Sequence, residues 1–348
     1  MRVHDRRRAA AVTAARSRRW LSPLAMLVHM LSACGAADDG TSATPTAATT
    51  SQPASSPVRT EPSVQTDPPV QTEPPGEVES IDLGGAAWSA KAGFGGIWVQ
   101  VDAPVDAVVK VDVSTSEIVL EISRGRNVAF SADAAWVAMG PEVVKIDPSS
   151  GETQLTVPVE GSYVAVGAGS VWVPSADGAL VRIDPVTGTP LASIPIDPEE
   201  LTDVAASDQG VWVTSKPFGG VYRVDPSTNT VVASIKTGRG AHGLVIAESG
   251  VWVTNYQAGT VSRIDPATNT VVATIEDVGS EVGIVAADGA IWVSSRGLGV
   301  SRIDPATNAA TLVADLAGWN YGLAHDADAL WVTSVDSESL SRIVVAVP

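Results

Sequence analysis

The sequence is poor in the residues that build cysteine and histidine chemistry. Its 348 residues include one cysteine, Cys34, and four histidines. A single cysteine allows no disulfide within the chain. The patterns G-x-x-x-x-G-K-[ST], G-x-S-x-G, C-x-x-C and H-E-x-x-H are also missing. These absences leave phosphate-loop, nucleophile-elbow hydrolase and zinc chemistries without support.

Basic residues are scarce as well. The chain has 22 Lys and Arg against 39 Asp and Glu, a net charge of −17. Seven of the arginines fall within residues 1–33, so the rest of the chain is more acidic still. Nonspecific nucleic-acid binding needs a basic patch or stripe. The composition therefore predicts a protein with no nucleic-acid partner.

The first 33 residues have the pattern of a signal peptide, with a basic start and a short apolar stretch from Leu21 to Leu31. This stretch is too short to span a bilayer as a stable helix. It ends in Leu31-Ser32-Ala33-Cys34-Gly35, which resembles a bacterial lipobox. The resemblance implies cleavage before Cys34 and lipidation of its thiol; a free cysteine is the alternative. Ser17-Arg18-Arg19-Trp20-Leu21 also resembles a twin-arginine export signal, although an ordinary basic region explains it too.

Residues 34–77 are rich in Thr, Ser, Pro and Ala and hold almost no large apolar side chain. Such a segment cannot bury enough surface to order itself, so we expect a disordered, extended tether. With a lipid on Cys34, it would hold the following domain on the outer face of the cytoplasmic membrane or on the cell surface. The only membrane contact would be the lipid.

The remainder of the chain, residues 78–348, is organised by a repeat of about 40 residues. A Trp-Val pair recurs at seven tryptophans: Trp98, Trp136, Trp172, Trp212, Trp252, Trp292 and Trp331. Each period contains four short segments rich in Val, Ile and Thr, separated by Gly, Asn, Asp or Pro. Four strands per period of this length is the pattern of a β-propeller blade. The sequence therefore predicts an all-β, seven-bladed propeller with four-stranded antiparallel blades.

The two ends of the repeat region fit together. Glu77 to Leu83 has the pattern of a fourth strand that lacks its first three, and the chain stops at Pro348, just after a third strand. We therefore expect the N-terminal strand to pair into the last blade and close the ring, which removes an open sheet edge.

The motifs Val-Trp-Val-Thr-Asn at 251–255 and Ile-Asp-Pro-Ala-Thr-Asn at 264–269 resemble the YVTN-type bacterial propeller family. The resemblance covers about residues 78–348 and implies a seven-bladed propeller of the cell surface or periplasm. A related propeller group, the streptogramin B lyases, is enzymatic and metal-dependent. Its blades carry a Trp-Phe-Thr-Glu type of motif, whereas this chain has Trp-Val-Thr-Asn or Trp-Val-Thr-Ser.

Residues that recur in every blade are interpreted as structural. The seven tryptophans would fill the space between blades. The Asp-Pro-Ala-Thr-Asn segments, as in Asp265 to Asn269, would form turns in which Asp accepts backbone N–H bonds and Asn takes a left-handed conformation; a repeated metal site is the alternative. Val344 replaces this Asp in the last copy, as the turn interpretation expects. The Lys or Arg two residues before each such site would form a ladder of structural ion pairs.

A binding site should instead consist of residues that differ from one blade to the next. Ten residues before each repeat Trp, and one position later, the residue type varies widely, and these positions fall on the face where propellers bind. The predicted ligand-binding residues are Trp88, Arg126, Asn127, Tyr163, Asp203, His242 and Tyr321. Aromatic, basic and acidic groups at one mouth indicate a site for a polar ligand.

Two functions compete. The first is a binding or scaffolding module for an unidentified envelope ligand or protein, monomeric and without a cofactor. The alternative is a metal-assisted lyase or hydrolase of the streptogramin B lyase type, with His242 and Glu281 as acid–base groups or ligands of a divalent cation. The other histidine beyond the leader, His325, is expected near the opposite end of its strand. A purely structural stalk is a third possibility.

Overall fold

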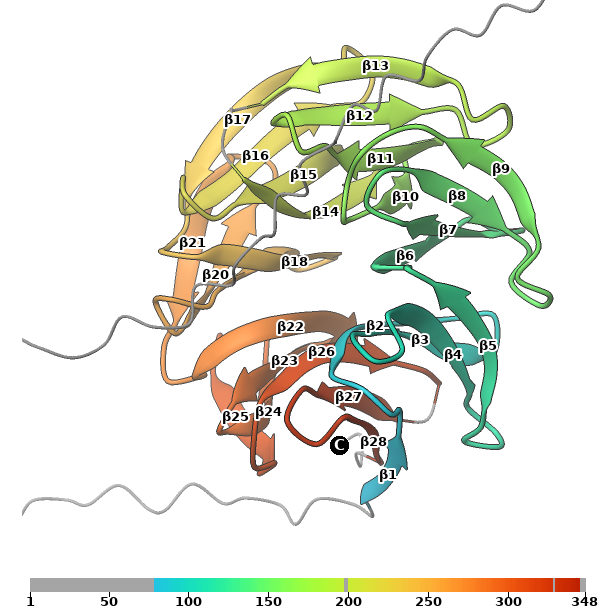
Figure 1. Ribbon diagram of the computed structural model, residues 1–348. Coiled ribbons are helices and arrows are strands. Elements are labelled where there is room, and N and C mark those ends of the chain that lie inside the picture. Colours follow the sequence, from blue (N-terminus) through green and yellow to red (C-terminus); the bar gives the residue numbers. More distant parts are fainter. Residues whose placement is uncertain (1–77, 197–199, 328, 345–348) are drawn as a thin grey trace, which may run out of the picture. The chain divides into compact units, whose positions relative to one another are not determined.

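The computed structural model describes residues 78–196, 200–327 and 329–344. The predictions for the signal peptide, for Cys34 and for the tether fall outside these residues. The described residues form 28 strands in seven four-stranded antiparallel sheets arranged as a ring, as Figure 1 shows. The prediction of a seven-bladed β-propeller is confirmed. Within the same residues, no helix has the length and apolar character needed to cross a membrane.

The chain completes one blade before it begins the next, and within a blade the strands run in sequence order from the centre of the ring outward. Blade 1 comprises β2 (Ala87–Gly93), β3 (Gly96–Val101), β4 (Ala107–Asp112) and β5 (Ile118–Ser123). Blade 2 comprises β6 (Asn127–Phe130), β7 (Ala135–Ala138), β8 (Val143–Ile146) and β9 (Thr153–Val157). Blade 3 comprises β10 (Ala165–Gly167), β11 (Ser170–Pro174), β12 (Ala179–Ile183) and β13 (Pro190–Pro195). Blade 4 comprises β14 (Leu201–Ser207), β15 (Gly210–Ser215), β16 (Gly220–Asp225) and β17 (Thr230–Lys236).

The remaining blades complete the ring. Blade 5 comprises β18 (Ala241–Ala247), β19 (Gly250–Asn255), β20 (Thr260–Asp265) and β21 (Thr270–Ile275). Blade 6 comprises β22 (Ser280–Ala287), β23 (Ala290–Arg296), β24 (Gly299–Ile303) and β25 (Ala310–Ala314). Blade 7 comprises β26 (Asn320–His325), β27 (Leu330–Ser334), β28 (Ser339–Ile343) and, on its outer side, β1 (Val78–Asp82).

The first strand of each blade lies at the centre of the ring and contacts the first strand of the next blade, including β26 against β2 (Figure 1). Strand β1 pairs antiparallel with β28, with Val78 opposite Ile343 and Asp82 opposite Ser339. The last blade is thus assembled from both ends of the repeat region.

The repeat tryptophans form the joints between blades, as predicted. All seven are buried, with at most 4% of their surface exposed. Trp212 of blade 4, for example, packs in one apolar cluster with Val251 and Val253 of blade 5. Burial of an indole removes up to about 200 Å² of mostly apolar surface from water, so these joints supply much of the stability of the ring.

The turn interpretation of the Asp-Pro segments is confirmed. The Oδ1 of Asp265 accepts a hydrogen bond from the backbone N–H of Ala267 at 2.8 Å, and its Oδ2 accepts one from the Thr268 hydroxyl at 3.0 Å. Asn269 has a φ of 57°. The turn leads directly from β20 into β21.

The predicted ladder of ion pairs is wrong. In blade 4, the guanidinium of Arg223 lies over the ring of Trp212, 5.0 Å from its centroid. Its Nη1 donates to the carbonyl of Pro266 at 2.6 Å and to the Oδ1 of Asn269 at 2.8 Å. The cation therefore bridges to the Asp-Pro turn of the next blade, whose carboxylate is already occupied by its own backbone. We call this arrangement the arginine latch.

The same latch joins blade 3 to blade 4 and blade 5 to blade 6. In blades 1 and 2 a lysine takes the place of the arginine and donates to the proline carbonyl of the next blade. The latching cations and the prolines whose carbonyls they reach are Lys110 with Pro148, Lys145 with Pro185, Arg182 with Pro226, and Arg263 with Pro305. The series ends at blade 6, because blade 7 has no Asp-Pro turn. In the described part of the chain, no side-chain hydrogen bond is made by Arg302 or Arg342, the equivalent arginines of blades 6 and 7.

Hydroxyl groups near the centre of the ring hold the blades that lack a latch. Ser294 of blade 6 donates to the carbonyl of Tyr321 in blade 7 at 2.7 Å. Thr333 of blade 7 donates to the carbonyl of Trp88 in blade 1. The third residue of the Trp-Val-Thr motif therefore has a role between blades that its sequence pattern did not reveal.

Candidate functional site

The residues predicted at the mouth of the ring are positioned by irregularities in the first strands. Strands β2, β14, β18, β22 and β26 each depart from regular pairing just where the predicted residues occur. In blade 4 the Thr214 hydroxyl accepts the N–H of Asp203 at 2.8 Å and donates to the carbonyl of His242 at 2.7 Å. A bulge of this kind re-aims the side chains that it carries. Blades 2 and 3 have Ala138 and Pro174 in place of the hydroxyl, and β6 and β10 pair without a bulge.

A small inner cavity of about 60 Å³ lies among the first strands. Five of the seven predicted ligand-binding residues line it: Asn127, Tyr163, Asp203, His242 and Tyr321. Ser89, which lies at one of the aligned positions, lines it too, as does Lys91, which was not predicted. A cavity of this size has room for only one or two water molecules, so these residues can form the floor of a site but cannot enclose a larger ligand.

His242 is the central side chain of this floor. It is 5% exposed, and its Nε2 lies 3.2 Å from the hydroxyl of Tyr321. The rings of Tyr163 and Tyr256 approach it edge-on, with centroids 6.3 Å away. Burial, with a smaller contribution from the charge of Lys216, lowers the pKa of His242 to about 3. The imidazole is therefore neutral at pH 7, and its Nδ1 has no hydrogen-bond partner among the described residues.

Asp203 ties two blades together at the same place. Its carboxylate accepts the N–H of Val204 at 2.9 Å and the N–H of Leu244, in blade 5, at 3.1 Å. Burial raises the pKa of Asp203, while the charge of Lys91 and the two N–H bonds act in the opposite direction. Burial also raises the pKa of Tyr321 to about 12, so this hydroxyl keeps its proton at neutral pH.

A larger cavity opens above this floor, and we call it the mouth cavity. It measures about 620 Å³ and is lined by Trp88, Lys216, Arg239, His242, Tyr256, Gln257, Ser280, Arg296, Trp319 and Tyr321. Trp88 makes edge contacts with Trp319 at 5.4 Å and with Tyr321 at 5.0 Å between ring centroids. The guanidinium of Arg296 lies over Trp319, 4.8 Å from its centroid. The cavity thus has an aromatic wall and several cations.

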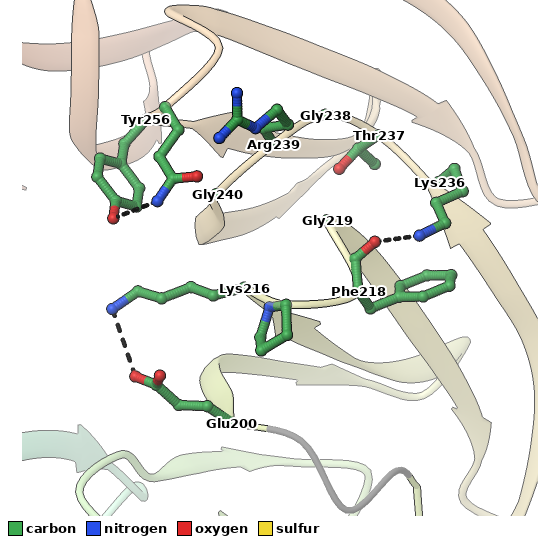
Figure 2. Close-up of a pocket in the computed structure, with 12 residues that line it drawn as sticks. Glu200, Lys216, Phe218, Gly219, Lys236, Thr237, Gly238, Arg239, Gly240 and Tyr256 are labelled. Atoms are coloured by element: carbon green, nitrogen blue, oxygen red, sulfur yellow. Dashed lines mark hydrogen bonds and ion pairs between the residues drawn. The ribbon is translucent and has the colours of Figure 1, made fainter. Parts of the chain in front are cut away.

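An adjoining cavity of about 800 Å³ shares Lys216, Arg239, Tyr256 and Gln257 with the mouth cavity. Figure 2 shows this cavity, with Lys216 extended toward Glu200. The Nζ of Lys216 lies 3.5 Å from the carboxylate of Glu200, which is largely exposed. Because they share these four side chains, the two cavities form one continuous surface that extends from blade 4 to blades 6, 7 and 1.

Not every predicted residue joins this site. Arg126 lines a separate cavity of about 550 Å³ with Glu160 and Tyr163. Glu281 lies in β22, in register with Ser295. His325 pairs with Asp288 at 2.9 Å, away from both the inner and the mouth cavity.

The described side chains offer few ligands for a divalent cation. Among them, no group of three or more His, Cys, Asp or Glu could hold a metal ion. His242 offers one nitrogen, and its Nε2 already contacts Tyr321.

The prediction missed most of the mouth cavity, because it compared only positions shortly before each repeat Trp. Lys216 and Arg296 follow a repeat Trp, and Arg239 and Trp319 lie in the segments between blades. One signal was available. Of the tryptophans beyond the leader, only Trp88 and Trp319 fall outside the seven-fold spacing. The structure places these two in contact with each other.

Comparison with known proteins yields no match to any family model and none to curated protein sequences. Solved structures do match. Virginiamycin B lyase from Staphylococcus aureus is similar with a TM-score of 0.66 and 12% identity, over 78% of this chain and 99% of the lyase. A catalytically inactive variant of that lyase with quinupristin gives 0.64 and 13%, over 78% and 99%. The WD40 repeats of RRP9 give 0.67 and 11%, over 80% and 100%. At these identities the likeness shows the fold alone.

Proposed function

We propose that this protein is an exported, lipid-anchored β-propeller that binds a component of the cell envelope at the mouth cavity. The leader, the lipobox-like segment ending at Cys34 and the tether support export and anchoring. Binding is a common use of the propeller fold, in which loops at one face of a rigid ring carry the recognition residues.

One observation carries the proposal: the mouth cavity joins an aromatic wall to cations from different blades. Its volume of about 620 Å³ falls within the roughly 300–1,000 Å³ of typical small-molecule sites. Trp88 and Trp319 lie outside the seven-fold spacing, and they contact each other on the lining of this cavity. Large rigid aromatic side chains and arginines are also the residues that dominate binding energy at interfaces.

The binding test is photo-crosslinking in cells. A photoreactive amino acid placed at Gln257, an exposed residue of the mouth cavity, should form an adduct with an envelope component. The matched control is Val232 on the outer strand β17, also exposed. We expect an adduct at Gln257 that disappears when Trp319→Ala is added, and none at Val232. Equal labelling at the two positions would contradict a specific mouth site.

The anchor is tested separately. Labelling of growing cells with a radioactive fatty acid should mark the wild-type chain and fail with Cys34→Ala. The wild-type protein should sediment with membranes, whereas the variant should be released. Label retained by Cys34→Ala would refute lipidation at this residue.

A second candidate is a lyase of the streptogramin B type, and the position of His242 favours it. The imidazole is neutral and lies at the boundary of the mouth cavity with the Tyr321 hydroxyl beside it. A neutral imidazole can accept a proton from a bound substrate. Virginiamycin B lyase shares the fold, and the variant solved with quinupristin, in which a histidine is replaced by alanine, is described as catalytically inactive. Glu281 is retained as the partner carboxylate of this proposal.

The lyase proposal is tested with quinupristin as the probe. The full chain is incubated with it in the presence of Mg²⁺, Mn²⁺, Ca²⁺ or Zn²⁺, and substrate loss is followed by chromatography. Loss that is abolished by His242→Ala and by Glu281→Ala would favour the lyase. A metal bound to the native state should also raise the unfolding midpoint. No substrate loss with any of the four ions would remove quinupristin-type lyase activity.

A further inference from the structure

The mouth cavity has a charge opposite to that of the protein around it. The chain carries a net charge of −17, yet the charged side chains that line this cavity among the described residues are Lys216, Arg239 and Arg296. No described carboxylate lines it. Lys216 has one acidic neighbour, Glu200, which lies in the adjoining cavity. The two arginines form no ion pair with a described residue.

These two arginines differ from the latch arginines of the same protein. Arg223 donates to Pro266, Asn269 and Gln209, so most of its donors are used within the fold. In the part of the chain that the structure describes, the guanidinium groups of Arg239 and Arg296 donate no hydrogen bond. A guanidinium has five N–H donors, and those of these two exposed arginines are open to water or to a ligand.

Arg296 is held in a defined orientation all the same. The Cζ of its guanidinium lies over the Trp319 ring, 4.8 Å from the centroid. Cation–π contact leaves the N–H donors at the edge of the plane free. The edge of a guanidinium forms paired hydrogen bonds with the oxygens of a carboxylate or a phosphate. Arg296 therefore offers N–H donors beside the aromatic wall, without an acceptor among the described residues.

On this basis, and resting on the function proposed above, we infer that the ligand of the mouth cavity is an organic anion whose carboxylate or phosphate group is held by Arg296 and Arg239. The volume of about 620 Å³ greatly exceeds that of a bare inorganic ion, so the charged group has a body attached to it. The aromatic wall of Trp88, Trp319 and Tyr321 supplies the apolar surface for that body. The anionic group can belong to a free small molecule or to an envelope polymer.

The test is isothermal titration calorimetry of the full chain in detergent, at constant ionic strength. Inorganic phosphate probes the anion site alone. Glucuronate and glucose form a pair that differs in the carboxylate, and glycerol 3-phosphate and poly(glycerol phosphate) form a pair that differs in chain length. The variants are Arg296→Gln and Arg239→Gln. Arg302→Gln removes the same charge from β24, outside the mouth cavity, and serves as the matched control.

We expect saturable binding of phosphate and of glucuronate, with glucose giving no heat of binding. Loss of a charge-assisted hydrogen bond should weaken binding by at least about tenfold in Arg296→Gln and Arg239→Gln, and Arg302→Gln should match the wild type. Tighter binding of the polymer than of glycerol 3-phosphate would identify a polymer as the source of the anion, and equal binding a free molecule.

Glucose bound as well as glucuronate, wild-type binding by both mouth variants, or no saturable binding of any anion would overturn the inference. Those results would leave the proposed function standing if the crosslink at Gln257 persists. If that crosslink is absent as well, both proposals fail.

Discussion

The arginine latch allows a direct prediction, because arginines at equivalent positions of different blades either make the bridge to the next blade or lack it. Arg223→Leu removes two part-buried hydrogen bonds to blade 5, an exposed one to the Gln209 carbonyl within blade 4, and the contact with Trp212. Hydrogen bonds to charged groups contribute about 1.5–3 kcal/mol each when buried. The side chain is partly exposed, so we take the lower value for each bond, and the apolar Leu recovers a fraction. We expect a loss of about 2–3 kcal/mol in the free energy of unfolding.

The matched substitution is Arg302→Leu in blade 6, where the next blade has no Asp-Pro turn and the side chain makes no hydrogen bond with a described residue. It should change stability by about 0.5 kcal/mol or less. Urea unfolding followed by tryptophan fluorescence gives both values. Equal destabilisation by the two substitutions would show that the charge or the packing of the arginine stem, and not the bridge to the next blade, is the stabilising element.

Three further predictions concern the joints and the floor of the site. Trp252→Ala empties a joint between blades and should cost about 3–5 kcal/mol in urea unfolding, whereas Val232→Ala on the exposed outer strand should have almost no effect. Thr333→Val keeps the shape but leaves the Trp88 carbonyl without its donor and the Gly322 N–H without its acceptor, so we expect a loss of about 1–2 kcal/mol by the same assay; an unchanged midpoint would contradict it. The folded-state pKa of His242, about 3, lies below the ordinary value of 6.5, so as pH falls from 6.5 toward 3 the unfolded chain takes up a proton that the folded protein does not. This lowers stability by up to about 1.4 kcal/mol per pH unit, and urea titrations at several pH values should show a shallower dependence in His242→Phe; identical slopes would exclude His242 as the cause.

The fold was predictable because seven buried tryptophans are a periodic signal that the spacing of a propeller imposes. The four-strand period then follows from alternating apolar and turn residues. Even the positions that face the centre could be found, since Asn127, Tyr163, Asp203 and His242 lie around one cavity.

The mouth cavity itself could not be predicted in the same way. Arg239 and Trp319 occupy the segments between blades, whose length varies, and Arg296 lies four residues after its repeat Trp, so counting back from that Trp reaches none of the three. The type of contact made by the repeated arginines was also predicted wrongly. An Arg two residues before an Asp suggests an ion pair, but the Asp accepts hydrogen bonds within its own turn and the Arg donates to the neighbouring blade. Partners in adjacent blades lie about 40 residues apart, and only the folded ring brings them together.

The pairing of β1 with β28 determines when the propeller can be completed during synthesis. Strand β1 is the first part of the described ring to be made, and its partner is the last, so β1 must wait while six blades form. Pairing strands so far apart in sequence is intrinsically slow. A chain that ends before β28 leaves β1 without its partner and blade 7 with only its two inner strands, β26 and β27. The closed ring therefore reports that translation has passed β28, because a product that stops earlier lacks the partner of β1.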